Sequence, residues 1–337
     1  MFKLERNIGL LGVPYEKGQP LPGASCGPKL IRSKKIIDEI EKYGVEVHDF
    51  GNIETAIVPN DTNIYSAKFP KSFLNNSLSI AKKITEIINK DYIPLTVGGD
   101  HTLSTGTILG HFQTHENISV VWVDAHADIN TPLSSVTGNM HGMPLAFSII
   151  EMQNEMPWIE EFKDLPPVIS AKHVVYIGLR DVDPYERYVL DKYKIKSFSM
   201  KNVDEVGINC VIQEAIKSVN PNLDRYFHLS FDVDALDPMY APSTGTRVPG
   251  GLSLREGIYL CEQLYNTGKL AAIDIAEINT QLGSYSDAMT TLNSGIKLIL
   301  GSVGIRREGI PIIGPDYYNW QNLNSTRKDV FEKLENK

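Results

Sequence analysis

Short apolar runs rich in β-branched residues alternate along the chain with longer amphipathic stretches. The runs predict strands over residues 8–13, 45–50, 92–98, 118–125, 173–179, 195–200, 226–234 and 269–278. Apolar positions at helical spacing predict helices over residues 27–44, 74–90, 102–112, 210–219 and 254–268. Strands that are apolar on both faces, separated by helices, are typical of a parallel sheet covered by helices on both sides.

This alternation alone does not distinguish an open, doubly wound sheet from a closed eight-stranded barrel. No Pro/Gly/Ser linker, charge block or internal repeat divides the 337 residues, which favours one domain over residues 1–337. Residues 310–337 end in a polar stretch, and we expect a mobile C-terminal tail there.

Composition and charge narrow the class of protein. A hydrophobic content of 42% with 22% charged residues is that of a globular protein with a sizeable core. The net charge of -8, without a block of Lys or Arg, argues against nucleic-acid binding, and no apolar run is long enough to cross a membrane. Three widely spaced cysteines, and an N-terminus that leaves no room for a secretory leader, predict a reducing, cytoplasmic setting.

Ionisable side chains follow three of the predicted strands. They occur in "YIPLTVGGDH", "VVWVDAHAD" and "HLSFDVD" and are His101, Asp124, His126, Asp128, Asp232 and Asp234. Both candidate architectures carry their functional loops at the carboxyl ends of the strands, so we expect these side chains to converge. Four carboxylates in one cleft raise each other's pKa values unless cations neutralise them, and two divalent ions would balance the four charges.

Taken singly, each of these features has an ordinary structural explanation, because a DxD at a strand end commonly caps a turn. Their combination favours a metal centre. If the chain is extended from Asp124 to Asp128, alternate side chains share one face, but the two Cα atoms lie about 13 Å apart, so two ions or a bend are needed. Oxygen and imidazole ligands suit Mn²⁺, while Zn²⁺, Co²⁺ and Ni²⁺ stay open. A pair of such ions generates hydroxide from water, which indicates hydrolysis.

Six motifs occur in the order and nearly the spacing of the ureohydrolases: "GGDH", "DAHADIN", "SSVTGNMHGMP", "GLRDVDPYE", "SFDVDALDP" and "DIAEIN". The chain resembles an arginase over approximately residues 5–310. The resemblance implies an arginase/deacetylase-like catalytic domain, a three-layer α/β/α sandwich around an open, mainly parallel eight-stranded sheet. It also implies two Mn²⁺ per subunit, with other divalent ions such as Co²⁺ as alternatives.

The implied activity is the metal-dependent hydrolysis of L-arginine to L-ornithine and urea, by a metal-bridging hydroxide that attacks the guanidinium carbon. Such an enzyme is a hydrolase of linear amidines in arginine metabolism and the urea cycle. On the matching positions the metal ligands would be His101, Asp124, His126, Asp128, Asp232 and Asp234. Asp128 would also relay a proton, His141 would act as acid/base or proton shuttle, and Glu277 would pair with the guanidinium group.

The resemblance assigns the other end of the substrate to two sets of residues. Neutral donors would bind the α-carboxylate, and acids would bind the α-ammonium group. The implied substrate-binding residues are Asn130, Ser135, Thr137, Asn139, Asp181, Asp183, Glu186 and Thr246. The chain departs from the arginase pattern at Tyr185, Arg247 and Thr280, and Tyr185 lies near the expected α-ammonium site.

Two alternatives from other classes stay open. A related ureohydrolase, such as an agmatinase or guanidinobutyrase, would differ in its substrate, and a non-catalytic scaffold on the same fold would show a lost ligand. The resemblance also implies a homotrimer, with a hexamer as the alternative, in which Arg255, Glu256, Arg306 and Arg307 make ion pairs between subunits.

Overall fold

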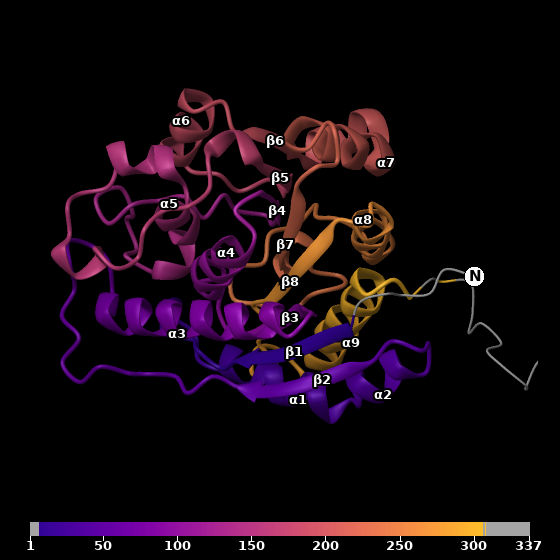
Figure 1. The fold of residues 1–337 in the computed structure, drawn as a ribbon. Coiled ribbons are helices and arrows are strands. Elements are labelled where there is room, and N and C mark those ends of the chain that lie inside the picture. Colours follow the sequence, from indigo (N-terminus) through magenta and orange to yellow (C-terminus); the bar gives the residue numbers. More distant parts are fainter. Residues whose placement is uncertain (1–6, 306, 308–337) are drawn as a thin grey trace, which may run out of the picture. The chain divides into compact units, whose positions relative to one another are not determined.

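One sheet of eight strands forms the centre of the protein, whose computed structural model describes residues 7–305 and residue 307. The strands are β1 (Asn7–Val13), β2 (Val47–Asn52), β3 (Tyr92–Gly98), β4 (Ile118–Val123), β5 (Val174–Leu179), β6 (Lys196–Ser199), β7 (Tyr226–Asp232) and β8 (Leu270–Ala276). Their order is β2-β1-β3-β8-β7-β4-β5-β6, and every neighbouring pair is parallel (Figure 1). The predicted parallel sheet is confirmed. It is open, with β2 and β6 at its edges, which decides against the barrel.

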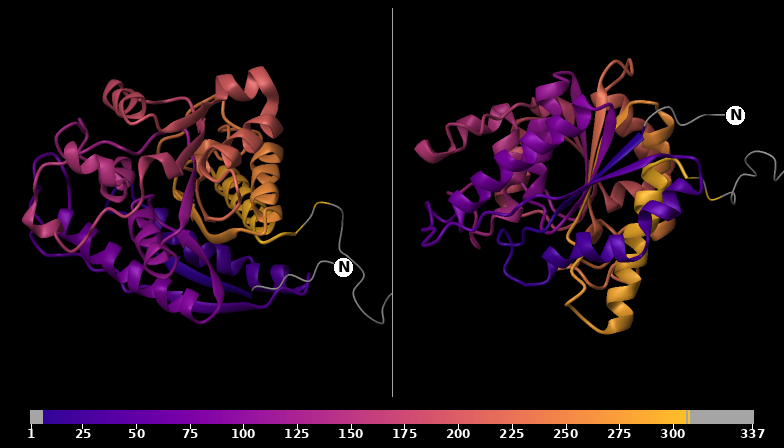
Figure 2. Two further views of the ribbon diagram at one scale, coloured as in Figure 1. Left: turned by 45° about the horizontal axis from the view of Figure 1, so that its top comes forward. Right: turned by 60° about the horizontal axis from the view of Figure 1, so that its bottom comes forward.

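Helices cover both faces of the sheet. They are α1 (Gly27–Ser33), α2 (Ile36–Glu41), α3 (Pro70–Asn89), α4 (Leu103–Thr114), α5 (Pro144–Ser148), α6 (Pro184–Lys192), α7 (Met200–Val219), α8 (Leu254–Asn266) and α9 (Tyr285–Ser302). Apolar residues of α1, α2, α7, α8 and α9 pack on one face, and those of α3, α4, α5 and α6 pack on the other (Figure 2). The three-layer arrangement expected from the sequence is therefore confirmed.

The two faces of each central strand belong to different parts of the core. In β4, for example, Val121 and Val123 face the α8 and α9 side, whereas Val120 and Trp122 face the α4 and α6 side. All six residues of β4 are buried. This double burial explains why the strand is apolar at every position instead of alternating.

Local backbone signals decide where the helices differ from the predicted ones. The helix expected over residues 27–44 is two helices, because Lys35 has a φ of 55° and interrupts the hydrogen-bond ladder. The prediction omitted α5, α6 and α9. Of these, α6 and α9 start with a capping box, formed by Asp183 with Glu186 and by Ser284 with Asp287.

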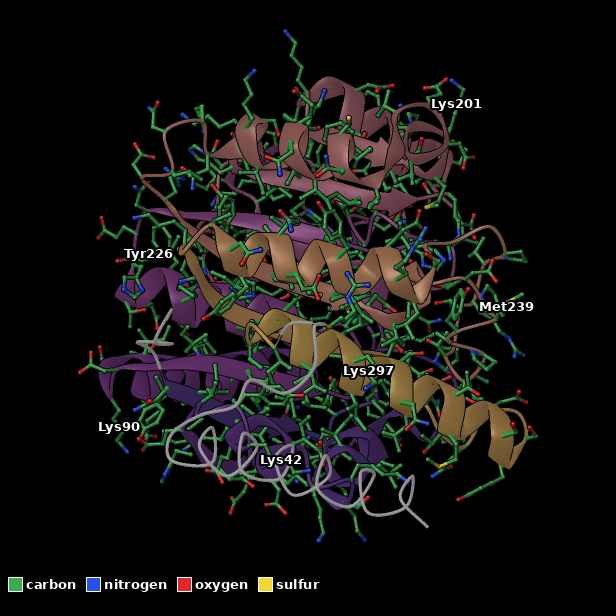
Figure 3. All side chains as sticks on the ribbon, turned by 90° about the vertical axis from the view of Figure 1, so that its right-hand side faces the viewer. Lys42, Lys90, Lys201, Tyr226, Met239 and Lys297 are labelled. Atoms are coloured by element: carbon green, nitrogen blue, oxygen red, sulfur yellow. The ribbon has the colours of Figure 1, made fainter. Side chains whose placement is uncertain are left out.

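Charged side chains project from the surface, as Lys42 at the end of α2 and Lys201 in α7 do in Figure 3. Within residues 7–305, no helix combines the length and apolar character needed to cross a membrane. The tail expected over residues 310–337 lies outside the described residues, and so does Arg306. The single-domain assignment over residues 1–337 therefore stays a prediction.

Candidate metal centre and active site

Four adjacent strands bring the candidate residues to one edge of the sheet. His101 follows β3, Asp124 directly follows β4, Asp232 is the last residue of β7, and Glu277 directly follows β8. These strands lie side by side in the order β3-β8-β7-β4. The carboxyl ends of neighbouring parallel strands thus collect residues that are far apart in the sequence.

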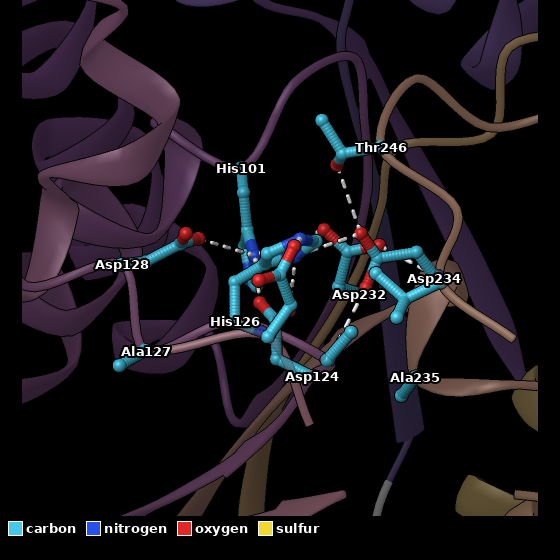
Figure 4. A network of polar contacts seen from close by, with 12 residues as sticks. His101, Asp124, His126, Ala127, Asp128, Asp232, Asp234, Ala235 and Thr246 are labelled. Carbon is cyan, nitrogen blue, oxygen red and sulfur yellow. Dashed lines mark hydrogen bonds and ion pairs between the residues drawn. The ribbon is translucent and has the colours of Figure 1, made fainter. Parts of the chain in front are cut away.

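His101 lies at the centre of three carboxylates (Figure 4). Its Nδ1 is 3.1 Å from Asp124 Oδ2, 3.3 Å from Asp128 Oδ2 and 3.3 Å from Asp232 Oδ2. The imidazole is fully buried and stacks on Trp122 with the ring centroids 4.0 Å apart. The indole and the three acids therefore fix the ring in one orientation.

His126 forms a second group beside the first. Its Nδ1 is 3.3 Å from Asp124 Oδ1 and 3.1 Å from Asp234 Oδ2. Asp124 thus offers one oxygen to each histidine, while Asp232 Oδ1 accepts the backbone N–H of Asp234 at 2.7 Å. We call the six residues His101, Asp124, His126, Asp128, Asp232 and Asp234 the metal cluster.

The electrostatics of the metal cluster reflect its excess of acid. Burial, followed by the charges of Asp234 and Asp124, raises the pKa of Asp232 well above its ordinary value. Burial and Asp124 likewise raise the pKa of Asp128 to about 6. Burial alone would lower the pKa of His126, but Asp234 and Asp124 outweigh it and raise that pKa strongly. The cluster therefore favours positive charge between its carboxylates.

The donor atoms fit a pair of divalent cations. Ligand atoms of His101, Asp124 and Asp128 lie within 4.8 Å of one another, and so do those of Asp124, His126 and Asp234. The two groups share Asp124. All are imidazole nitrogens or carboxylate oxygens, the ligand types that suit Mn²⁺ and neighbouring divalent ions. The sequence predicted these residues, and the structure brings all six together.

Of the two alternatives that the sequence left open between Asp124 and Asp128, two ions or a bend, the structure shows the bend. β4 ends at Val123, and Asp128 has a φ of 49°. The His126 N–H donates to Asp124 Oδ1 at 2.7 Å, which closes a turn directly after the strand. The chain therefore bends, and this bend lets both Asp124 and Asp128 reach His101.

Glu277 and His141 form an ion pair beside the metal cluster. Glu277 Oε1 accepts the His101 backbone N–H at 2.9 Å and lies 3.1 Å from His141 Nδ1. Burial would lower the pKa of His141, but the hydrogen bond and charge of Glu277 raise it to about 9. Glu277 has a φ of 64°, a conformation that costs about 1 to 3 kcal/mol and is held only by such contacts.

The second carboxylate oxygen of Glu277 faces an open position. Among the described residues, Glu277 Oε2 has no hydrogen-bond partner. A Cβ placed on Gly245 would lie 4.0 Å from this oxygen and 3.6 Å from Gln19 Oε1. The glycine thus keeps space in front of the carboxylate for a group that binds it.

The predicted α-ammonium residues are partly engaged with the protein itself. Asp183 caps α6, accepting the Glu186 N–H at 2.9 Å, and its Oδ2 accepts from Asn130 Nδ2 at 2.7 Å. Glu186 is buried, and its carboxylate accepts the backbone N–H groups of Ile129 and Asp183. Burial and the charge of Asp128 raise the pKa of Glu186 to about 8. Asp181 is exposed, with an oxygen 3.7 Å from His126 Nε2.

The other predicted substrate-binding residues lie in two places. Ser135 Oγ accepts the Gly138 N–H at 3.0 Å, and Thr137 Oγ1 accepts the Asn139 N–H at 3.2 Å, so both brace the loop after the DxHxD segment. Thr246 instead donates to Asp234 Oδ2 at 3.0 Å and belongs to the surroundings of the metal cluster.

Sequence reasoning missed a second group of buried polar residues, which we call the buried histidine cluster: His111, His228 and Asp274. His228 Nε2 lies 2.8 Å from Asp274 Oδ2, and His111 Nδ1 lies 3.2 Å from His228 Nδ1. Single polar residues in the apolar strands β7 and β8 were the available signal. The cluster reaches the metal cluster through Ser230, whose Oγ is 3.0 Å from His101 Nε2 and 3.4 Å from Asp274 Oδ2.

Asp100 was also missed, although it precedes His101. Its carboxylate accepts the Gly18 N–H at 2.6 Å and the Thr102 N–H at 3.1 Å. Burial and the charge of Glu277 raise its pKa to about 7. Asp100 thus ties the loop around Gly18 to the active-site edge, where the His141 N–H donates to Gly18 O.

Comparison with known proteins first defines the class, that of hydrolases with the arginase fold. A family model described as "Arginase family" matches residues 6–301. The hepatic arginase of Aquarana catesbeiana is 45% identical over 91% of this chain and 95% of its own. The arginase structure from Bacillus caldovelox gives a TM-score of 0.82 at 29% identity, covering 90% of this chain and all of its own. The structure of an Entamoeba histolytica arginase, solved with L-ornithine, gives a TM-score of 0.78 at 28% identity. This match covers 89% of this chain and 99% of the Entamoeba chain.

The chain therefore belongs to the arginase family. It is a hydrolase that converts arginine to ornithine and urea. The likeness extends over nearly the whole chain and includes the segments that carry the metal cluster.

Proposed function

We propose that the enzyme works with two Mn²⁺ ions per subunit, held by His101, Asp124, His126, Asp128, Asp232 and Asp234. The observation that carries this proposal is the position of Asp124, which offers one oxygen toward each of two histidines. The donor set admits Co²⁺ as an alternative. When bound, the two ions supply hydroxide from water near neutral pH and Lewis-acid stabilisation of developing negative charge.

Glu277 orients the guanidinium group of arginine. Its Oε1 is held by His101 and His141, while Oε2 faces the space that Gly245 keeps open. A carboxylate in this position binds the planar fork of N–H donors and aims the guanidinium carbon at the metal cluster. The strained backbone of Glu277 supports a role in substrate binding.

His141 donates the proton that the leaving amine requires. With its Nδ1 bound to Glu277 and its pKa near 9, the ring is protonated at neutral pH and holds a second proton at Nε2. Neutral amine then leaves as L-ornithine. Asp128, a carboxylate whose pKa burial and Asp124 raise to about 6, accepts and passes on a proton during the reaction.

The amino-acid end of arginine lies along the loop over residues 130–139, which follows the metal ligands at the end of β4. Asn130, Ser135, Thr137 and Asn139 provide neutral donors for the α-carboxylate, and Asp181, Asp183 and Glu186 provide acids for the α-ammonium group. Thr246 orients Asp234. The L-ornithine complex of the Entamoeba relative supports a substrate with an α-amino acid end.

We infer a cytoplasmic enzyme that assembles as a homotrimer, with a hexamer as the alternative. Three free cysteines in the described chain support a reducing compartment. Of the residues expected at the interface, Glu256 accepts from Ser253 in the capping box of α8, so its carboxylate is already engaged. Sedimentation of the wild-type protein tests assembly, and a strict monomer near 37.6 kDa would contradict it.

The proposed function is tested by a steady-state urea assay on protein stripped of divalent ions. L-Arginine turnover should be lost on chelation and restored by Mn²⁺, while agmatine should be a poor substrate. Full activity in chelator would contradict the metal proposal. Preferred turnover of agmatine would contradict the assignment of the α-amino acid end.

A further inference from the structure

A segment remote in sequence is joined to the loop expected to bind the α-carboxylate. The Ser66 N–H donates to Pro132 O at 3.1 Å, and the Lys68 N–H donates to Gly138 O at 2.9 Å. The Ser66 hydroxyl also donates to Pro132 O, at 2.7 Å. The approach at Gly138 is so close that a Cβ there would lie 1.9 Å from Ser66 O. Residues 64–68 therefore hold the loop over residues 131–139 in place.

Lys68 extends from this segment to a residue of the predicted site. Its Nζ donates to Asn139 Oδ1 at 3.1 Å, and its side chain is part-buried. No carboxylate of residues 7–305 forms an ion pair with Lys68, whereas the more exposed Lys42 and Lys90 pair with Glu39 and Glu86. A part-buried ammonium group paired only with an amide oxygen is suited to bind an anion.

The contact also fixes which way Asn139 is turned. Because Asn139 Oδ1 accepts from Lys68, its Nδ2 is the group left to donate, so the amide N–H and the ammonium group belong to one donor set. Asn139 lies two residues before His141, which contacts Glu277. Lys68, from the remote segment, thus contacts the same short loop that carries a catalytic candidate.

We propose that Lys68 supplies the positive charge that binds the α-carboxylate of arginine and so selects α-amino acids over guanidines that lack this group. The inference rests on the proposed function, which places the α-carboxylate on the loop over residues 131–139, and it adds a charged donor to a set of otherwise neutral ones. Charge-assisted hydrogen bonds are about twice as strong as neutral ones, so such a residue would dominate the discrimination.

The test compares wild type with Lys68→Gln, which keeps a donor for Asn139 but removes the charge. The kcat/KM for L-arginine should fall about tenfold, mainly through KM, and turnover of agmatine should be unchanged. Calorimetry should show L-ornithine binding weakened by about the same factor and putrescine binding unchanged, since putrescine lacks the carboxylate. Lys68→Arg should restore most of the arginine affinity, and Lys71→Gln, at an exposed lysine three residues away, should behave as wild type.

Two results would overturn the proposal. Unchanged L-arginine and L-ornithine affinities in Lys68→Gln would show that the charge plays no part. Equal losses for L-ornithine and putrescine would assign Lys68 to loop support alone. A wild-type protein without arginine turnover would instead contradict the proposed function, and the L-ornithine binding experiment would still test Lys68.

Discussion

Two buried groups of His and Asp residues lie a short distance apart and differ in what they can do. In the metal cluster, four carboxylates surround two imidazoles. The carboxylate oxygens outnumber the N–H groups that the two imidazoles can donate to them. In the buried histidine cluster, the one carboxylate contacts His228, which in turn contacts His111, and Thr107 also donates to Asp274 at 2.6 Å. The same residue types thus form an acid-rich site in one place and, in the other, a short hydrogen-bonded chain in which His111 Nε2 and Asp274 Oδ1 find no partner among the described residues.

The difference follows from position along the strands. The metal cluster lies where strands end, so turns and loops direct several carboxylates to one point. His228 and Asp274 lie within β7 and β8 and face α4, where each must find a partner in the core. If Nε2 of His228 donates to Asp274, its Nδ1 accepts from His111, so the two rings and the carboxylate form one hydrogen-bonded chain. Excess acid at strand ends, and not burial of histidine, marks the functional site.

Removing one acid from the metal cluster should have the largest effect. We expect Asp232→Ala to lower kcat for L-arginine by about a thousandfold or more and to reduce the bound metal, because a negative ligand is lost. Urea production and metal content by mass spectrometry measure both. Asp204→Ala, at an exposed position on α7, is the control and should match wild type. Wild-type activity in Asp232→Ala would remove this residue from the centre.

The pKa values of His141, beside the metal cluster, and of His111, in the buried histidine cluster, should be shifted in opposite directions. Glu277 raises the pKa of His141 to about 9 against burial, whereas burial and then His228 lower the pKa of His111. Protonation of His141 therefore stabilises the folded protein below about pH 6.5, and this contribution is lost as the pH rises through about 9. Histidine NMR on metal-free protein should show the His141 pKa falling toward or below 6.5 in Glu277→Gln.

The same Glu277→Gln variant should lose about a hundredfold in kcat/KM, because the guanidinium group loses its counter-charge. Asn279, two residues further on, is fully buried and unsuitable as a control, so exposed Glu205→Gln serves instead. An unshifted His141 pKa in Glu277→Gln would refute the pairing of the two residues.

Breaking the buried histidine cluster should affect stability more than chemistry. Asp274→Ala leaves His228 and Thr107 without their acceptor, and we expect the free energy of unfolding to fall by about 2 to 4 kcal/mol. Asp274→Asn, which keeps an acceptor, should lose less. Urea denaturation measures the change. If Asp274→Ala instead lost its metal at unchanged stability, the distinction between the two clusters would fail.

The smallest effect should come from a support of the metal cluster. Thr246→Val removes the hydrogen bond to Asp234 but keeps the shape of the side chain. We expect a loss of about tenfold in metal affinity, at the lower end of the range for residues that orient metal ligands. Metal titration followed by calorimetry would detect it, and Thr280→Val is a matched control away from this bond. A loss as large as that of Asp232→Ala would mean that Thr246 is itself a ligand.

Sequence reasoning found the strands and the metal cluster because both leave local signals. β4 is apolar at six successive positions, and Asp124, His126 and Asp128 stand at every second position after it. It left the bend before Asp128 as one of two alternatives and did not find the strained backbone at Glu277, since tertiary contacts impose both conformations. Nor could it pair Lys68 with Asn139, because 71 residues separate them and only the folded loops bring them together.

The most direct test of the account is anomalous diffraction near the manganese absorption edge, on crystals of the protein loaded with Mn²⁺. We expect two peaks, one among His101, Asp124, Asp128 and Asp232 and the other among His126, Asp124, Asp232 and Asp234, with no peak at His111, His228 and Asp274. A single peak, or none at the metal cluster, would contradict the two-ion centre.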